Sequence, residues 1–142
     1  MHNINNLAYT LMKKRNYEEA ESLFRKVFSL SQKLFGDKHY IPGIHLTNII
    51  IVLNEQNQYQ QACELTDQAK RLLSNSLELG HWRYSVLNSA KGQCLYSNPT
   101  LAKELMFTSY EDLKLKHGDN SSYTKEALAR LLQRFPDYAD NK

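Results

Sequence analysis

Apolar residues recur along most of this chain at intervals of three and four positions, which is the period of an amphipathic helix. The first example runs through Leu7 and Leu11, and a second through Ala20, Phe24 and Val27. The same spacing predicts helices over residues 3–14, 17–35, 40–56, 59–78, 82–97, 99–117 and 122–135. The pattern therefore predicts an all-α chain of seven helices and no strands.

The sequence also repeats itself with a period of 42 residues. A shift by that period pairs Asn6 with Asn48, Leu7 with Ile49, Leu11 with Leu53, Tyr17 with Tyr59, Ala20 with Ala62, Leu23 with Leu65, Leu30 with Leu72 and His39 with His81. A third, weaker copy aligns at an offset of 40, where Ala102 matches Ala62. Periods of 20–50 residues indicate stacked supersecondary units, here helical hairpins.

The repeat predicts one domain over residues 1–142, with repeat 1 at about 3–38, repeat 2 at about 39–80 and repeat 3 at about 81–118. A capping helix at about 121–135 and a tail at 136–142 follow. Polar residues before the helices predict side-chain N-caps at Asn16, Asn57, Asn98 and Ser121. Gly118 is expected to end a helix at positive φ, and the two repeat-related histidines are expected to shape equivalent loops.

Composition supports a helical chain: five Gly and three Pro in 142 residues leave little material for a turn-rich β fold. Lys and Arg number 18 and Asp and Glu 15, giving a net charge of +3 with mixed signs along the chain. The start lacks the pattern of a secretory signal, and no stretch of eighteen apolar residues occurs. We therefore expect a cytoplasmic protein in which Cys63 and Cys94 are free thiols.

The sequence offers no assembled catalytic or metal site. The five glycines stand alone, without the strand and spacing of a phosphate-binding loop. His39 and His45 lie six positions apart, with no Cys or carboxylate placed to complete a tetrahedral metal site. We expect no cofactor, no metal and no enzymatic activity. The basic run from Lys13 to Arg15 is interpreted as a solvated helix end, with nucleic-acid binding as an unfavoured rival.

Residues 5–40 resemble a tetratricopeptide repeat of the kinesin light chain type. The residues that carry the resemblance are Asn5, Asn6, Leu7, Ala8, Tyr17, Glu18, Glu19, Ala20, Phe24, Gly36 and His39, and the second copy keeps Asn48, Tyr59, Ala62 and Ala69. Residues 92–131 resemble the closing repeat and terminal helix of such arrays, including those of bacterial serine/threonine kinases. The resemblance implies a right-handed α-solenoid whose concave face, lined by the first helix of each pair, holds peptides or partner helices.

The candidate binding residues are those that the helical period places on the inward face, relative to an expected buried face at Leu7 and Leu11. They are Asn5, Asn6, Tyr9, Lys13, Thr47, Asn48, Ile51, Glu55, Ser89, Gln93, Tyr96, Arg130 and Gln133. The resemblance implies that Asn6 and Asn48 hydrogen-bond the backbone of a bound peptide. Ala90 occupies the corresponding position in the third copy.

These observations favour a protein-interaction scaffold that binds a peptide or partner domain, with no membrane contact. A structural or self-association role, through the exposed seam of a truncated first helix, remains the main alternative. The short first helix fits either a short native protein or the C-terminal part of a larger regulatory protein. The sequence does not name the ligand.

Overall fold

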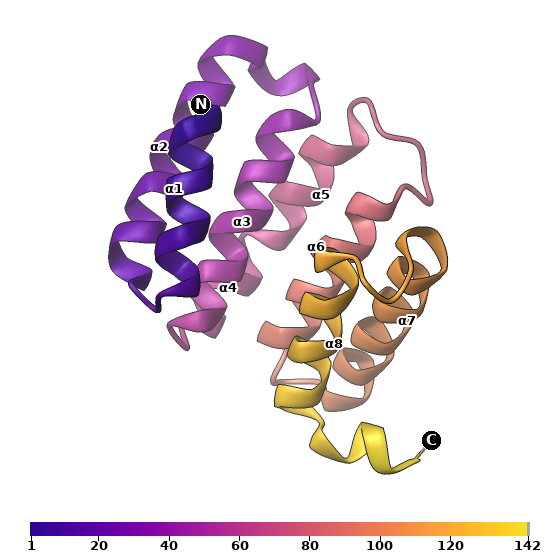
Figure 1. The fold of residues 1–142 in the computed structure, drawn as a ribbon. Coiled ribbons are helices and arrows are strands. Elements are labelled where there is room, and N and C mark those ends of the chain that lie inside the picture. The colour runs from indigo at the N-terminus through magenta and orange to yellow at the C-terminus, as the bar shows by residue number, and fades with distance from the viewer. Residues whose placement is uncertain (142) are drawn as a thin grey trace. The chain divides into compact units, whose positions relative to one another are not determined.

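The computed structural model describes residues 1–141, and the side chains of residues 1–138. Residue 142, the last of the predicted tail, lies outside the described residues. The α-helices are α1 (His2–Lys13), α2 (Tyr17–Phe35), α3 (Ile41–Glu55), α4 (Tyr59–Glu64), α5 (Thr66–Ser74), α6 (Trp82–Cys94), α7 (Pro99–His117) and α8 (Ser122–Arg134) (Figure 1). Short 3-10 helices cover Gly36–Lys38 and Pro136–Asn141. The described chain contains no strand, so the all-α prediction is confirmed.

The predicted helix over residues 59–78 differs most from the structure. It is interrupted at Leu65, which separates α4 from α5, and it ends four residues early at Ser74. The Thr66 hydroxyl donates to the Cys63 carbonyl oxygen at 2.8 Å. A side-chain bond to a nearby carbonyl competes with the helical backbone ladder, which accounts for the interruption.

The chain divides into two compact units, Met1–Leu79 and the part from Gly80 onward. The division falls one residue before the predicted border between repeats 2 and 3. In the first unit α1 packs on α2, α2 on α3, and α3 on α4 and α5. Helix α3 is buried along nearly its whole length because it has neighbours on two sides, and its sequence is correspondingly apolar all round.

Small residues mark the closest helix approaches in each hairpin. Ala20, Ala62 and Ala102 occupy matching positions in the three copies, and none of them is exposed. In the second unit α6 packs on α7 and α8, and α7 packs on α8. Gly92 of α6 lies so close to α7 that a Cβ there would be 2.9 Å from the Ala102 carbonyl oxygen. The repeat alignment therefore identified true packing positions.

Helix ends follow the predictions only in part. The Asn98 Oδ1 accepts from the Leu101 amide at 3.1 Å, and Gly118 has φ of 82°, so both predictions are confirmed. Asn16 and Ser121 precede their helices but make no capping bond. The Asn57 Oδ1 accepts from the Tyr59 hydroxyl at 2.7 Å instead. The three capping predictions at Asn16, Asn57 and Ser121 are therefore wrong.

The two repeat-related histidines do shape equivalent loops. The His39 Nδ1 accepts from the Ile41 amide at 3.2 Å, and the His81 Nδ1 accepts from the Arg83 amide at 3.1 Å. Each histidine also stacks on the aromatic ring that follows it, Tyr40 or Trp82. Each one thus caps the first turn of the next helix with its own ring.

The cysteines contradict the sequence-based expectation. Cys63 and Cys94 are both disulfide-bonded, and the part of the chain that the structure describes contains no free cysteine. The prediction of two free thiols is therefore wrong. A helical pattern places a cysteine on a helix but does not show whether its sulfur forms a disulfide.

Candidate functional site

A hydrogen bond between two helices of the first unit joins two of the predicted binding residues. The Tyr9 hydroxyl, from α1, donates to the Asn48 Oδ1, from α3, at 2.8 Å. The Tyr9 ring is itself held edge-on against Phe24 of α2, with ring centroids 5.4 Å apart. Since the amide oxygen of Asn48 is occupied, its NH2 group remains as the donor that this side chain can offer to another molecule.

The environment of Asn48 is more enclosed than the sequence predicts. Only 5% of Asn48 is exposed, and Thr47 and Ile51 beside it on α3 are also buried, whereas Asn6 on α1 is exposed. The Thr47 hydroxyl donates to the Gly43 carbonyl oxygen at 2.8 Å, within its own helix. The expectation that the Asn48 side chain points away from the core is therefore wrong, because α3 lies between other helices.

The expected buried face of α1, from which its inward face was defined, also needs correction. Leu7 is 52% exposed and Leu11 is partly buried, although both were expected in the core. The buried position of this helix is Ala8. Helix α1 packs on α2, and Leu7 lies outside that contact. The exposed Leu7 is the one apolar side chain among the exposed residues of α1, the others being polar or charged.

The remaining predicted residues of α1 and α3 divide between exposed and partly buried positions. Lys13 is exposed, and Asn5 is partly buried, with an Oδ1 that has no hydrogen-bond partner among the described residues. Glu55 Oε2 accepts from the Tyr17 hydroxyl at 3.5 Å. Burial and the nearby Glu55 carboxylate raise the pKa of Tyr17 above its ordinary value. Glu55 thus already has a protein partner.

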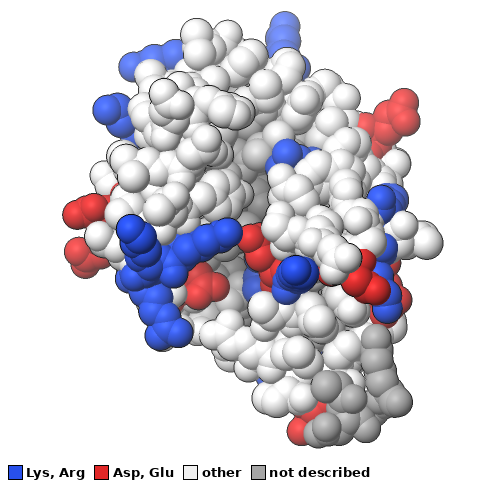
Figure 2. Space-filling view, in the orientation of Figure 1, with Lys and Arg blue, Asp and Glu red and all other residues white. Residues whose placement is uncertain are grey.

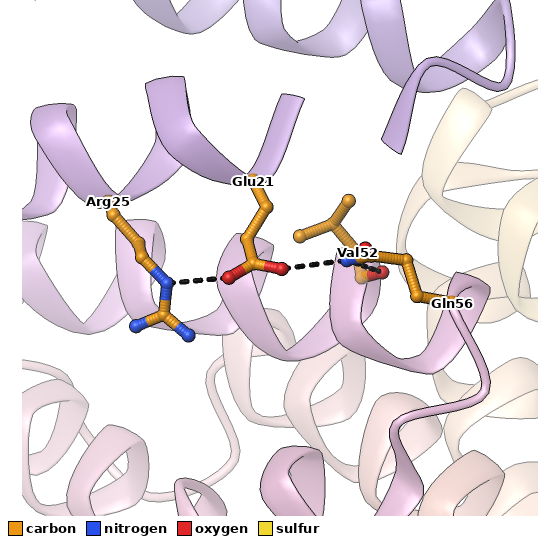
Figure 3. A network of polar contacts seen from close by, with 4 residues as sticks. All are labelled: Glu21, Arg25, Val52 and Gln56. Atoms are coloured by element: carbon orange, nitrogen blue, oxygen red, sulfur yellow. Dashed lines mark hydrogen bonds and ion pairs between the residues drawn. The ribbon is translucent and has the colours of Figure 1, made fainter. Parts of the chain in front are cut away.

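A polar network that the sequence analysis missed joins α2 to the end of α3 (Figure 3). The Glu21 carboxylate accepts from Arg25 Nε and from Gln56 Nε2, each at 2.8 Å, and Gln56 Nε2 also donates to the Val52 carbonyl at 3.2 Å. Burial alone would raise the pKa of Glu21, but the hydrogen bonds from Arg25 and Gln56 and the charge of Arg25 lower it below 4.5. The Glu21 and Arg25 spacing of four residues was the available signal.

The same network also removes one cation from the basic surface near the end of α1. Figure 2 shows Lys and Arg side chains gathered where α1 ends in Figure 1, and Lys13, Lys14 and Arg15 lie there, all exposed. Arg25, which could have extended this run, is instead ion-paired with Glu21. Cations at a helix C-terminus are stabilised by the helix dipole, so the run has a structural explanation.

In the second unit the structure brings two more predicted residues together. Arg130 Nε, from α8, donates to the Ser89 Oγ, from α6, at 3.0 Å, and both residues are buried. Gln93, one turn after Ser89, is 4% exposed, and its Oε1 has no partner among the described residues. Ser89 and Gln93 therefore share one side of α6, with Ser89 bonded to α8.

Tyr96 and Gln133 are exposed. The Arg134 guanidinium lies over the Tyr96 ring at 4.2 Å from its centroid, and Arg134 also donates to the Gly92 carbonyl. Arg134 was not among the predicted residues. Its position four residues after Arg130 was the signal that could have found it.

The described residues offer neither a metal-binding cluster nor a membrane-spanning helix. Among the described residues, no three His, Cys, Asp or Glu side chains are grouped so as to hold a metal ion. Within the same part of the chain, no helix combines the length and apolar character needed to cross a membrane.

Comparison with protein families gives the family. A family model described as tetratricopeptide repeat matches residues 1–74, which is more than half of the chain. The chain belongs to the tetratricopeptide repeat family. Tetratricopeptide repeats generally mediate protein–protein interactions. A comparison of this tetratricopeptide repeat chain with curated proteins found no match.

Proposed function

We propose that this tetratricopeptide repeat chain is an interaction module that binds an extended peptide, or an extended segment of a partner protein, along α1 and α3, the first helices of its first two repeats. It acts by recognition and not by catalysis. The family match and the polar residues on α1 and α3 support this proposal. The 42-residue period further supports assignment to the kinesin light chain type. The two disulfide-bonded cysteines speak against the cytoplasmic location expected from the sequence, so no location is part of this proposal.

The observation that carries the proposal is the bond from the Tyr9 hydroxyl to Asn48. A peptide that binds in extended form must replace the water bonded to its backbone amides and carbonyls. An asparagine already fixed through its oxygen offers a donor at a set position, and less side-chain entropy is lost on binding. Asn6, exposed on α1, supplies a second amide that retains both donor and acceptor capacity.

The experiment starts from peptides selected from a display library against the wild-type chain. Binding affinity and thermal melting are then measured for Asn6→Ala, Asn48→Ala and Lys14→Ala. Loss of one amide leaves a peptide group unpaired, at a cost of about 1–3 kcal/mol or about 5- to 150-fold in affinity. Asn6→Ala should weaken binding with unchanged melting, because Asn6 is exposed.

Asn48→Ala is expected to weaken binding and also to lower stability, because it removes the acceptor of the Tyr9 hydroxyl. Tyr9→Phe serves as the matched control, since it removes the same internal bond but keeps the Asn48 amide. Asn48→Ala should therefore weaken binding more than Tyr9→Phe does. Binding that survives both asparagine changes and is lost with Lys14→Ala and moderate salt would refute the proposal in favour of an electrostatic surface.

A second candidate function is self-association through the outer side of α1, and the exposed Leu7 favours it. An apolar side chain exposed to this degree on a helix is stabilised when another surface covers it. Sedimentation at several protein concentrations distinguishes the two candidates. A mass that rises with concentration in the wild type but stays at one chain in Leu7→Lys supports self-association, and a constant monomer mass excludes it.

A further inference from the structure

The residues just before α6 are held to the second unit by contacts that involve one titratable ring. Gly80 has φ of 90°, and its carbonyl accepts from the Lys116 ammonium of α7. The next residue, His81, accepts the Arg83 amide at its Nδ1, at 3.1 Å. In a neutral imidazole one nitrogen is a donor and the other an acceptor, so this bond requires the tautomer with its proton on Nε2.

The groups around His81 and its stacked neighbour Trp82 come from all three helices of this unit. On α6, the His81 ring stacks on Trp82 at a centroid distance of 5.6 Å, and the Arg83 guanidinium lies over the same Trp82 at 4.2 Å. On α7, Lys116 is ion-paired with Asp112 at 3.1 Å. Two further rings contact Trp82: those of His117 from α7 and Tyr123 from α8, each at a centroid distance of 4.7 Å.

These surroundings disfavour the charged form of His81. Burial lowers the pKa of His81 below its ordinary 6.5, and the charges of Arg83, Lys116 and His117 lower it further. A protonated imidazole would gain from stacking on Trp82, but Arg83 already occupies a position over that indole. The neutral ring is therefore the form that this loop accommodates.

We propose that His81 is a pH-sensitive cap of α6: its neutral ring holds the first turn of the helix, and protonation at Nδ1 releases it. A proton on Nδ1 converts the acceptor into a donor that faces the donor N–H of Arg83, so the bond is lost. The new positive charge then lies beside the helix N-terminus, where the dipole disfavours cations. The released part is the segment from Gly80 to the first turn of α6.

The first repeat provides an internal comparison. His39 makes the same bond to the Ile41 amide, but its ring is stacked between Phe35 and Tyr40. His81 has the cations Arg83 and Lys116 near it in addition to the Trp82 ring, whereas the ring contacts of His39 are with Phe35 and Tyr40. The same cap bond therefore recurs in two repeats, in different surroundings.

The test is a titration of the full chain from pH 8 to pH 4.5, followed by NMR of the histidine side chains and of the Arg83 and Ile41 amides. The Arg83 amide resonance should shift with the same midpoint as the His81 ring, below 6.5. Its protection from hydrogen exchange, corrected for intrinsic rates, should fall about two- to tenfold as the bond is lost.

His81→Asn keeps a side-chain acceptor at the cap position but removes the titration, so its Arg83 amide should stay protected across the range. Lys116→Gln removes one facing cation and should move the His81 midpoint to higher pH. The proposal is wrong if the Arg83 amide does not respond while His81 titrates. It is equally wrong if His81→Asn shows the same loss of protection, because another group would then be the cause.

Discussion

Replacing Gly92 with alanine tests how closely α6 and α7 approach each other. A Cβ at Gly92 would lie 2.3 Å from Met106 Cγ and 2.9 Å from the Ala102 carbonyl oxygen. The methionine side chain is flexible and can turn aside. The carbonyl belongs to the backbone of α7 and cannot move unless the two helices shift. The substitution therefore forces a change in the helix packing.

Two effects of opposite sign decide the size of the change. Alanine is favoured over glycine in a helix interior by about 1 kcal/mol. Extra volume in a well-packed interior costs about 1–3 kcal/mol. Because one of the two close contacts is with backbone, we expect the cost to exceed the gain, with a net loss of up to about 2 kcal/mol in the free energy of unfolding.

Urea unfolding followed by circular dichroism measures this free energy. Met106→Ala, and the double variant of Gly92 and Met106, complete a double-mutant cycle. The added Cβ should cost less when Met106 is already alanine, since the contact with Cγ is then absent. A Gly92→Ala chain that is as stable as the wild type, or more stable, would refute the inferred close approach, because helix propensity alone would then decide the outcome.

Three further predictions test other parts of the fold. Asn98→Ala should lower the free energy of unfolding by about 0.5–2 kcal/mol through loss of its cap bond, whereas Ser121→Ala, where no such bond exists, should change it little. Equal losses of stability in denaturant unfolding would contradict the assignment of the cap to Asn98 alone. Glu21 has a pKa lowered below 4.5, so its stabilising contribution is complete above about pH 4.5 and is lost as the pH falls through the folded-state pKa. Glu21→Gln should therefore be less stable than the wild type at pH 7, and a difference in stability that persists in acid would contradict this. Ala20→Leu should cost about 1–3 kcal/mol because Ala20 is fully buried, and neutral melting would place it outside the core.

The helices were predictable because their signal is local. Periodic apolar positions indicated the helices, and the internal repeat, at an offset of 42 for the second copy and 40 for the third, indicated buried small residues such as Ala62 and Ala102. The break at Leu65 was not predictable in this way, since it depends on whether the Thr66 hydroxyl bonds a carbonyl of its own helix. Caps failed for a related reason: asparagine before a helix permits a cap bond, but the local backbone and competing partners decide whether it forms.

The candidate site was less predictable because its environment depends on residues far apart in the sequence. The helical period predicted Tyr9 and Asn48 on the inward face of the first helices, but it could not show that one bonds the other across 39 positions. Burial followed from the place of α3 between its neighbours, which no single-helix pattern contains. As a consequence, Asn48 contributes to folding as well as to the proposed binding, so its variants are informative only beside Tyr9→Phe and the exposed Asn6.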